Sequence, residues 1–232
     1  MASASDNPPR LASDAVHDRL RRAILRGDLP PGSALPSERE LSAKHRVNRH
    51  AVREAIKRLQ QSGLVQVSQG GATRVLDWRL TGGLDLLDDL AQIEDGGELR
   101  RAIAEMRATI GIDAARLCAE RAGEALRDEL RRLGAALRDP AEHRRYQDRF
   151  EAYEALWARI VDGSENLAYR LAFNSLVGVR HARDVDLRVY AAEVDDPVAG
   201  RHLANAVADG DVDRARRTAH DLLRRTLEAA VS

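Results

Sequence analysis

The stretch from Leu35 to Val75 constrains the fold of this chain more than any other part of it. Ser37 and Glu40 form an S-x-x-E capping box, in which each side chain satisfies a backbone N–H of the first helical turn, so a helix is predicted to begin there. Asn48 is a second residue of the N-cap type, and Gly63 suits the left-handed conformation that ends helices. The pattern predicts a short helix, a tight turn and a longer helix, which together make a helix-turn-helix.

The second of these helices is predicted to have two different faces. Residues four and seven or eight positions apart share a face of a helix. The apolar face comprises Val52, Ile56 and Leu59, and the basic face comprises Arg49, Arg53 and Lys57. We expect the first face to pack in a core, and the second to meet an anion or, as the ordinary alternative, water.

The hydrophobic period changes from 3.6 to 2 after Gly63. Residues 64–67 and 72–75 alternate as strands do, and the turn between them contains Gly70 and Gly71, so the segment predicts a β-hairpin. Ala34 and the residue after it are expected to add a very short strand to this hairpin. A helix-turn-helix followed by a hairpin is a winged helix.

This segment resembles the N-terminal domain of the GntR family of bacterial transcription regulators. The matching residues follow the family's pattern in order and without gaps, and they are Leu35–Leu41, Val52–Ala55, Leu59, Gly63–Val65 and Gly70. The resemblance implies a DNA-binding domain whose partner is a double-stranded operator.

The residues expected to bind DNA lie on the basic helix face and at the tip of the hairpin. A recognition helix enters the major groove with its N-terminus first, so Arg49 and His50 should be closer to base edges than Lys57. Together with the positions that the resemblance implies, the predicted set is Ser37, Arg39, Asn48, Arg49, His50, Ala51, Arg53, Gln69 and Gly70. Regulators of this type often have a basic residue where Gly71 stands, so weaker contacts by the wing are expected.

Charge is distributed unevenly along the 232 residues, although the chain has no net charge. Residues 1–78 contain 13 Lys and Arg against 8 Asp and Glu, and the remainder contains 24 against 29. The basic N-terminal part favours a nucleic-acid partner. There is no apolar run of membrane-spanning length and no signal segment, so a cytoplasmic protein without a membrane partner is expected. The single Cys118 is expected to be buried and inert.

The chain is predicted to be mainly α-helical, with four parts: a disordered tail (1–9), a winged helix-turn-helix (10–77), a linker with a short helix (78–97) and an all-α antiparallel bundle (98–232). The first helix is expected from Ser13 to Arg26. The bundle helices are expected at about 98–122, 124–138, 141–162, 165–183, 197–209 and 211–230, with a short turn at 186–192.

The C-terminal part resembles the effector-binding domain of the FadR subfamily of GntR regulators. The resemblance is carried by Glu105–Arg107, Ala114–Leu117, Ser164–Leu167 and Ala206–Asp211. It implies a homodimer controlled by a small-molecule effector, and it aligns Arg107 with an arginine of the family's effector pocket.

Arg107 falls within an expected apolar stripe of Leu99, Ile103, Met106, Ile110, Ala114 and Leu117. A guanidinium in that place must either extend to solvent or meet an anion inside the bundle. A row of aromatic residues follows helical spacing on another helix, at Tyr146, Phe150, Tyr153 and Trp157, which is typical of a core but also of a pocket within one. The predicted effector-binding residues are Arg107, Tyr153, Trp157 and His202, and the expected effector is an organic acid or an acyl-CoA-like conjugate.

Many members of the subfamily hold a divalent metal, and the resemblance places Tyr153 and Trp157 where two of its ligands would stand. His202 and His220 lie on the last two predicted helices, but their spacing falls short of the family's by about one turn. No structural metal or other cofactor is therefore expected. A metal-dependent sensor of organic acids within the same family is the alternative.

The sequence thus predicts a transcription regulator that binds an inverted-repeat operator as a dimer. An enzyme is the alternative from a different class. It is disfavoured because the chain has no G-x-S-x-G motif and no Gly-rich nucleotide loop after a strand.

Overall fold

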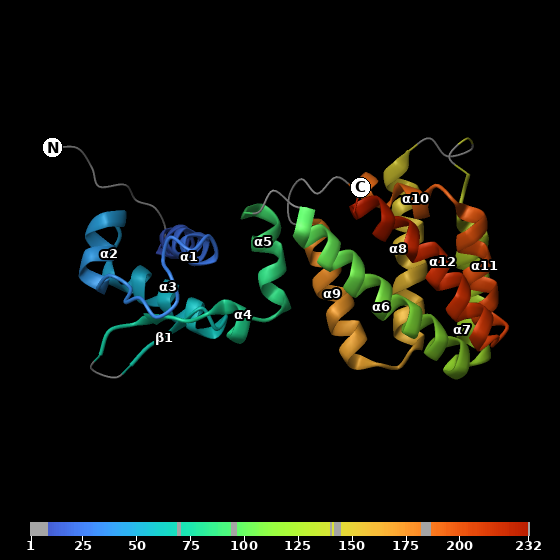
Figure 1. The fold of residues 1–232 in the computed structure, drawn as a ribbon, viewed down its shortest axis with the longest axis horizontal. Helices are drawn as coiled ribbons and strands as arrows, with labels where there is room; N and C mark the ends of the chain where they lie inside the picture. The colour runs from blue at the N-terminus through green and yellow to red at the C-terminus, as the bar shows by residue number, and fades with distance from the viewer. Residues whose placement is uncertain are drawn as a thin grey trace. The chain divides into compact units, whose positions relative to one another are not determined.

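The computed structural model describes residues 9–68, 71–93, 97–139, 141, 145–181 and 187–231. The chain divides into two compact units, residues 1–93 and 94–232 (Figure 1). The first contains a helix-turn-helix with a two-stranded antiparallel sheet, and the second is helical throughout its described part. This confirms the predicted fold class. Within the described ranges, no helix combines the length and apolarity needed to cross a membrane.

The first unit contains α1 (Pro9–Leu25), α2 (Glu38–His45), α3 (Arg49–Gln61), β1 (Val65–Gln66), β2 (Arg74–Val75), α4 (Trp78–Thr81), the 3-10 helix η1 (Leu84–Leu86) and α5 (Leu87–Ile93). The predicted start of the first helix at Ser13 is wrong, because α1 begins at Pro9 and Ser13 is buried within it. Proline fits the first helical turn, where its fixed φ is helical and its missing N–H costs no hydrogen bond. Pro9 therefore belongs to α1, and the rest of the predicted tail lies outside the described residues.

The predicted caps of the helix-turn-helix are confirmed. Ser37 N–H donates to Glu40 Oε2 at 2.8 Å, and Glu40 N–H donates to Ser37 Oγ at 3.3 Å, so the capping box is complete. The Asn48 side chain accepts from Ala51 N–H at 2.8 Å at the start of α3. These local hydrogen bonds fix where both helices begin, and therefore how the basic face of α3 is presented.

The predicted hairpin is present, with shorter strands than expected. Val65 pairs with Val75, and Gln66 pairs with Arg74. Ala34 forms an isolated β-bridge to Arg74, so the strand expected at this position is reduced to one bridged residue. The predicted tip residues Gln69 and Gly70 lie outside the described residues.

Residues 78–93, which the sequence analysis placed in a linker, pack within the first unit. Leu86 and Leu90 are buried. Arg21 of α1 forms a 2.5 Å ion pair with Asp89 and donates to the carbonyl of Asp85 at 3.1 Å. This segment is therefore held to α1 by both apolar and charged contacts.

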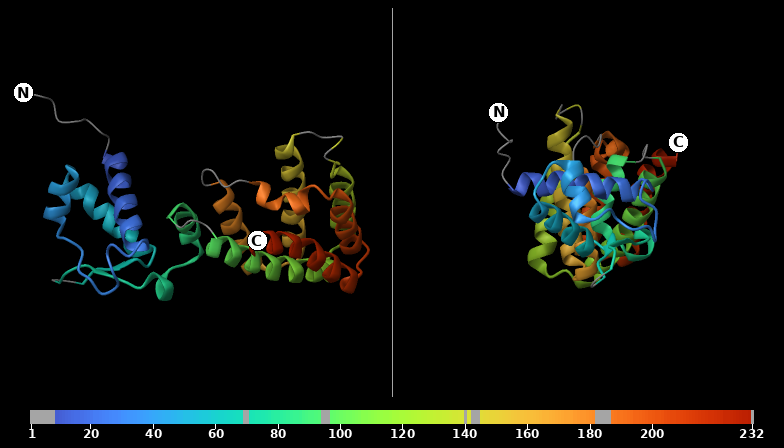
Figure 2. Two further views of the ribbon diagram at one scale, coloured as in Figure 1. Left: turned by 45° about the horizontal axis from the view of Figure 1, so that its top comes forward. Right: turned by 90° about the vertical axis from the view of Figure 1, so that its left-hand side faces the viewer.

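The second unit contains α6 (Gly97–Arg121), α7 (Glu124–Ala136), α8 (Tyr146–Gly163), α9 (Leu167–His181), the 3-10 helix η2 (Leu187–Tyr190), α10 (Ala191–Val194), α11 (Pro197–Ala208) and α12 (Val212–Val231). The long helices α6 and α12 run side by side, and α11 packs against both α7 and α12 (Figure 2, left). The predicted start of the third bundle helix at 141 is wrong, because Arg145 is still extended (φ −80°, ψ 109°). The Arg145 side chain is exposed, so burial does not draw this residue into the helix.

The face that α6 turns to the core differs from the predicted stripe. Ile103, Met106 and Ile110 are only partly buried. The buried residues are mostly small, and they are Ala104, Gly111, Ala114, Ala115, Leu117, Cys118 and Ala119. A Cβ atom at position 111 would lie 2.6 Å from Leu223 Cδ1, so glycine there allows α12 to approach closely. Burial raises the pKa of the Cys118 thiol to about 12, in keeping with the expected inert cysteine.

Candidate functional site

The recognition helix α3 has the two faces that its sequence predicted. Val52, Ile56 and Leu59 are buried against the first unit's core, whereas Arg49, His50, Arg53 and Lys57 are exposed. The positive end of the helix dipole lies at Arg49, where it adds to the attraction for a phosphate group. The arrangement presents a basic surface around the N-terminal half of α3.

The cations of this surface are not equivalent. Arg53 Nε donates to Glu38 Oε2 of α2 at 2.7 Å. This ion pair must break before Arg53 Nε can contact a DNA phosphate. Among the residues that the structure describes, Arg39, Arg49 and Lys57 have no ion-pair partner and are exposed. These three are available to an anion without first breaking a contact.

Three of the predicted DNA-binding residues have structural roles. Ala51 is 1 % exposed and its N–H donates to Asn48 Oδ1, so its methyl group belongs to the buried face of α3. The side chains of Ser37 and Asn48 are exposed, but each caps a helix. Both therefore orient the basic surface.

Arg107 faces the interior of the second unit, and its side chain is 15 % exposed. Its Nη1 donates to Glu193 Oε1 at 2.7 Å, and its Nη2 donates to Glu193 Oε2 at 2.5 Å. The Glu193 side chain is fully buried, so this is a bidentate ion pair inside the bundle. The alternative that Arg107 extends to solvent is therefore excluded, and its anionic partner is a residue of the same chain.

Tyr153 completes a buried polar cluster with Arg107 and Glu193. Its hydroxyl donates to Glu193 Oε2 and lies 3.5 Å from Arg107 Nη2. Burial and the Glu193 carboxylate raise the pKa of Tyr153 well above its ordinary value, so the hydroxyl keeps its proton. Burial opposes the charge of Arg107, but Glu193 outweighs it and raises the pKa of the guanidinium.

Glu193 begins a segment that we term the acidic turn, residues 193–196, in which three carboxylates each pair with an arginine from a different helix. Arg107 of α6 holds Glu193. Nη2 of Arg149 in α8 lies 2.7 Å from Oδ1 of Asp195, and Nη1 of Arg225 in α12 lies 2.6 Å from Oδ2 of Asp196. The acidic turn thus connects three helices of the bundle.

Glu193 is not among the residues predicted for this site, and residues 193–196 lie between the predicted turn at 186–192 and the predicted helix at 197–209. The sequence does contain a signal for this cluster of ion pairs, because Glu193, Asp195 and Asp196 fall within four residues. Arg107 and Arg149 are each next in sequence to apolar residues of a helix that faces the core. An acidic segment of that kind is a natural partner for arginines that the bundle buries.

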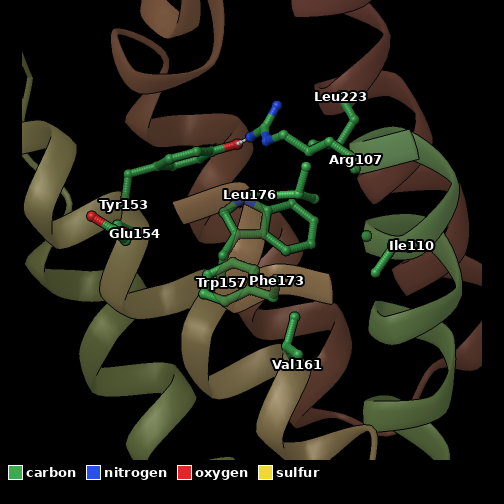
Figure 3. A pocket seen from close by; sticks show the side chains of 10 residues that line it. Arg107, Ile110, Tyr153, Glu154, Trp157, Val161, Phe173, Leu176 and Leu223 are labelled. Atoms are coloured by element: carbon green, nitrogen blue, oxygen red, sulfur yellow. Dashed lines mark hydrogen bonds between the residues drawn. The ribbon is translucent and has the colours of Figure 1, made fainter. Parts of the chain in front are cut away.

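A small cavity adjoins Arg107, with a volume of about 30 Å³ (Figure 3). It is lined from four helices by Arg107, Ile110, Gly111, Tyr153, Glu154, Trp157, Val161, Phe173, Leu176 and Leu223. Figure 3 shows Arg107 and Tyr153 approaching each other at one end, with the Trp157 indole and apolar side chains beyond them. The space is the size of one water molecule, and its walls are mainly apolar.

Trp157 adds a polar atom to the cavity. Its indole N–H is buried and makes no hydrogen bond of acceptable geometry to any described residue. Buried donors of this kind normally have a partner, so the indole offers a donor to a guest in the cavity.

The structure brings together three of the four predicted effector residues. Arg107, Tyr153 and Trp157 line one cavity, but His202 is exposed on α11 and does not line it. The prediction that His202 reaches this site is therefore wrong, because the face of α11 that packs on the bundle contains Leu203 and Val207. His220 is also exposed, and within the described residues no group of three His, Cys, Asp or Glu side chains could hold a metal ion.

A winged helix with a basic recognition helix, followed by a helical domain with a small internal cavity, has the architecture of a transcription regulator with a sensor domain. The chain belongs to the GntR family: residues 12–75 match the bacterial regulatory proteins of the gntR family, and residues 102–225 match the FCD domain. This family consists of transcription regulators, which excludes the enzyme alternative.

Relatives of known family agree with this assignment. The chain is 37% identical to the HTH-type transcriptional regulator Mce2R of Mycobacterium tuberculosis over 226 residues, which cover 92% of this chain and 89% of that protein. It is 40% identical to the fatty acid metabolism regulator protein of Shewanella halifaxensis over 76 residues, 33% of this chain and 32% of that protein.

Two solved structures share the fold at low sequence identity. A GntR protein of Streptococcus agalactiae has a TM-score of 0.52 at 20% identity, over 93% of this chain and 99% of that one. The Lar protein, which controls the agr system of Listeria monocytogenes, has a TM-score of 0.58 at 16% identity, over 94% of this chain and 95% of that one.

Proposed function

We propose that this regulator binds an inverted-repeat operator as a homodimer in the cytoplasm and is controlled by an organic acid or acyl conjugate bound in its second unit. The observation that carries the effector half is the cavity beside Arg107, Tyr153 and Trp157. It combines a cation, a hydroxyl and an indole N–H at one end with apolar walls, which is the composition of a site for an amphiphilic anion.

We expect Arg49 to read bases and Lys57 to contact the DNA backbone, since Arg49 begins α3 and Lys57 lies two turns deeper along it. Arg49→Ala should weaken specific binding by about 1–3 kcal/mol and relax base preference. Lys57→Ala should weaken specific and random duplexes to a similar extent. Titration of both variants against the two duplexes by fluorescence anisotropy measures the difference, and equal losses on both duplexes for Arg49→Ala would refute this assignment.

A homodimer is expected because one winged helix spans too few base pairs to select an operator. Two-fold symmetry doubles the contacts and matches an inverted repeat. Light scattering at micromolar concentration should give twice the 25.6 kDa of the chain. A value equal to one chain at that concentration counts against the proposal.

The proposed effector site can be closed by filling it. Leu176 of α9 lines the cavity, whereas Leu171 of the same helix is exposed. Native mass spectrometry of the unmodified protein should detect a copurifying ligand. Leu176→Trp should retain operator binding and lose this ligand, whereas Leu171→Trp should retain both. An unchanged ligand content in Leu176→Trp would place the effector elsewhere.

We further propose that the effector binds without a structural metal, because Tyr153 and Trp157 stand at the two positions where the family resemblance would place metal ligands. Elemental analysis of the purified protein tests this. One zinc or nickel ion per chain, whose removal abolishes the effector response, would favour the metal-dependent alternative.

A further inference from the structure

The fork of the Arg107 guanidinium is already filled. Both Nη atoms donate to the two carboxylate oxygens of Glu193, at 2.7 and 2.5 Å. We propose that Glu193 occupies the place on Arg107 that the carboxylate of the effector takes when it binds. The effector is then a monocarboxylate with an apolar tail, and its binding displaces Glu193. This inference rests on the function proposed above.

Charge balance makes the two carboxylates mutually exclusive. Arg107 and the fully buried Glu193 form a neutral pair. A second buried carboxylate beside them would face one guanidinium with two negative charges, in a region where desolvated charge is costly. An incoming carboxylate that replaces Glu193 keeps the pair neutral and retains the bidentate geometry, and it also inherits the hydrogen bond from Tyr153.

Glu193 belongs to a helix, α10, that is short enough to shift. It lies in α10, which is a single turn of four residues between η2 and α11. The other two carboxylates of the acidic turn are more exposed than Glu193, since the Asp195 and Asp196 side chains are 38% and 33% exposed. Displacement of Glu193 therefore releases α6 from the acidic turn, while Arg149 and Arg225 keep the turn attached to α8 and α12.

The apolar tail follows from the walls beyond Arg107. Ile110, Val161, Phe173, Leu176 and Leu223 line the space next to the guanidinium, together with the Trp157 ring. The volume of about 30 Å³ holds no hydrocarbon tail, so the ligand must part these side chains as it enters. Displacement of Glu193 and opening of the cavity are then two parts of one event.

Octanoate and its methyl ester are suitable probes, since they share a tail and differ in charge. The chain has two tryptophans, so Trp78→Phe leaves Trp157 as the only one, and its fluorescence reports on the cavity. In this background, Glu193→Gln should bind octanoate at least about tenfold more tightly, because the competing carboxylate is gone. Methyl octanoate should bind both proteins with similar affinity.

Asp195→Asn is the matched control, because it loosens the same turn and leaves the Arg107 fork filled. It should change octanoate affinity by less than about twofold. No gain of affinity in Glu193→Gln, an equal gain in Asp195→Asn, or no saturable binding of octanoate by either protein would each overturn the proposal.

If Glu193→Gln does not fold, amide hydrogen exchange of the protein with native Glu193 tests whether octanoate displaces this side chain. Octanoate should speed exchange at the amides of residues 191–195, and methyl octanoate should not; equal exchange with both probes overturns the proposal.

Operator binding measured in parallel separates this inference from the proposed function. If octanoate displaces Glu193 and leaves operator affinity unchanged, effector control by this route fails. If another ligand releases the operator without displacing Glu193, the displacement fails and effector control stands.

Discussion

Glu193→Ala is expected to lower the free energy of unfolding of the second unit by about 3–5 kcal/mol. The substitution leaves the Arg107 guanidinium buried without its carboxylate and removes the acceptor of the Tyr153 hydroxyl. Urea unfolding followed by Trp157 fluorescence, in a Trp78→Phe background, measures the change within this unit.

The double variant Arg107→Met/Glu193→Leu is the informative control. Replacing both members of a buried ion pair with apolar side chains is often neutral or stabilising, so this variant should recover most of the lost stability. If it is as unstable as Glu193→Ala, the loss arises from disturbed packing of α10 and the stranded charge is not its cause.

Leu59→Ala should destabilise the first unit by about 2–5 kcal/mol, because it leaves a cavity where a fully buried side chain stood. Operator binding should then fail at temperatures where the native protein still binds, although Leu59 lies opposite the basic face of α3. Trp78 fluorescence in a Trp157→Phe background follows the unfolding of this unit.

Arg53→Ala provides the comparison for Leu59→Ala. It lies on the same helix and is exposed, so it should weaken DNA binding and leave the unfolding of the first unit within about 0.5 kcal/mol of the native value. If Leu59→Ala and the native protein unfold at the same urea concentration, the assignment of this face as core is wrong.

The helix-turn-helix could be predicted from the sequence because its determinants are local. The capping box joins Ser37 to Glu40, and the cap of α3 joins Asn48 to Ala51, each over three residues. Interactions of such short range can be read from spacing alone. The burial of Ala51, by contrast, depends on packing against other helices, so it could not be read from spacing.

The interior of the second unit was harder to predict, because its contacts are distant in sequence. Arg107 and Glu193 are 86 residues apart, and no periodicity links them. The packing face of α6 was also misread, since a search for large apolar residues selects Ile103 and Met106, whereas close approach of α12 requires small residues such as Gly111. The available signal was the helical spacing of small residues on α6, at Gly111, Ala114, Ala115, Cys118 and Ala119.

The ion pair between Arg53 and Glu38 has a consequence for the thermodynamics of operator binding. When cationic side chains neutralise phosphates, condensed counterions leave the DNA, and the salt dependence of affinity reports their number. Glu38 is a counterion that Arg53 already carries, fixed to the protein at 2.7 Å. Formation of an Arg53–phosphate contact therefore frees a tethered carboxylate that must itself recruit a cation from solution, so the ions released at this position are partly offset by the ions taken up.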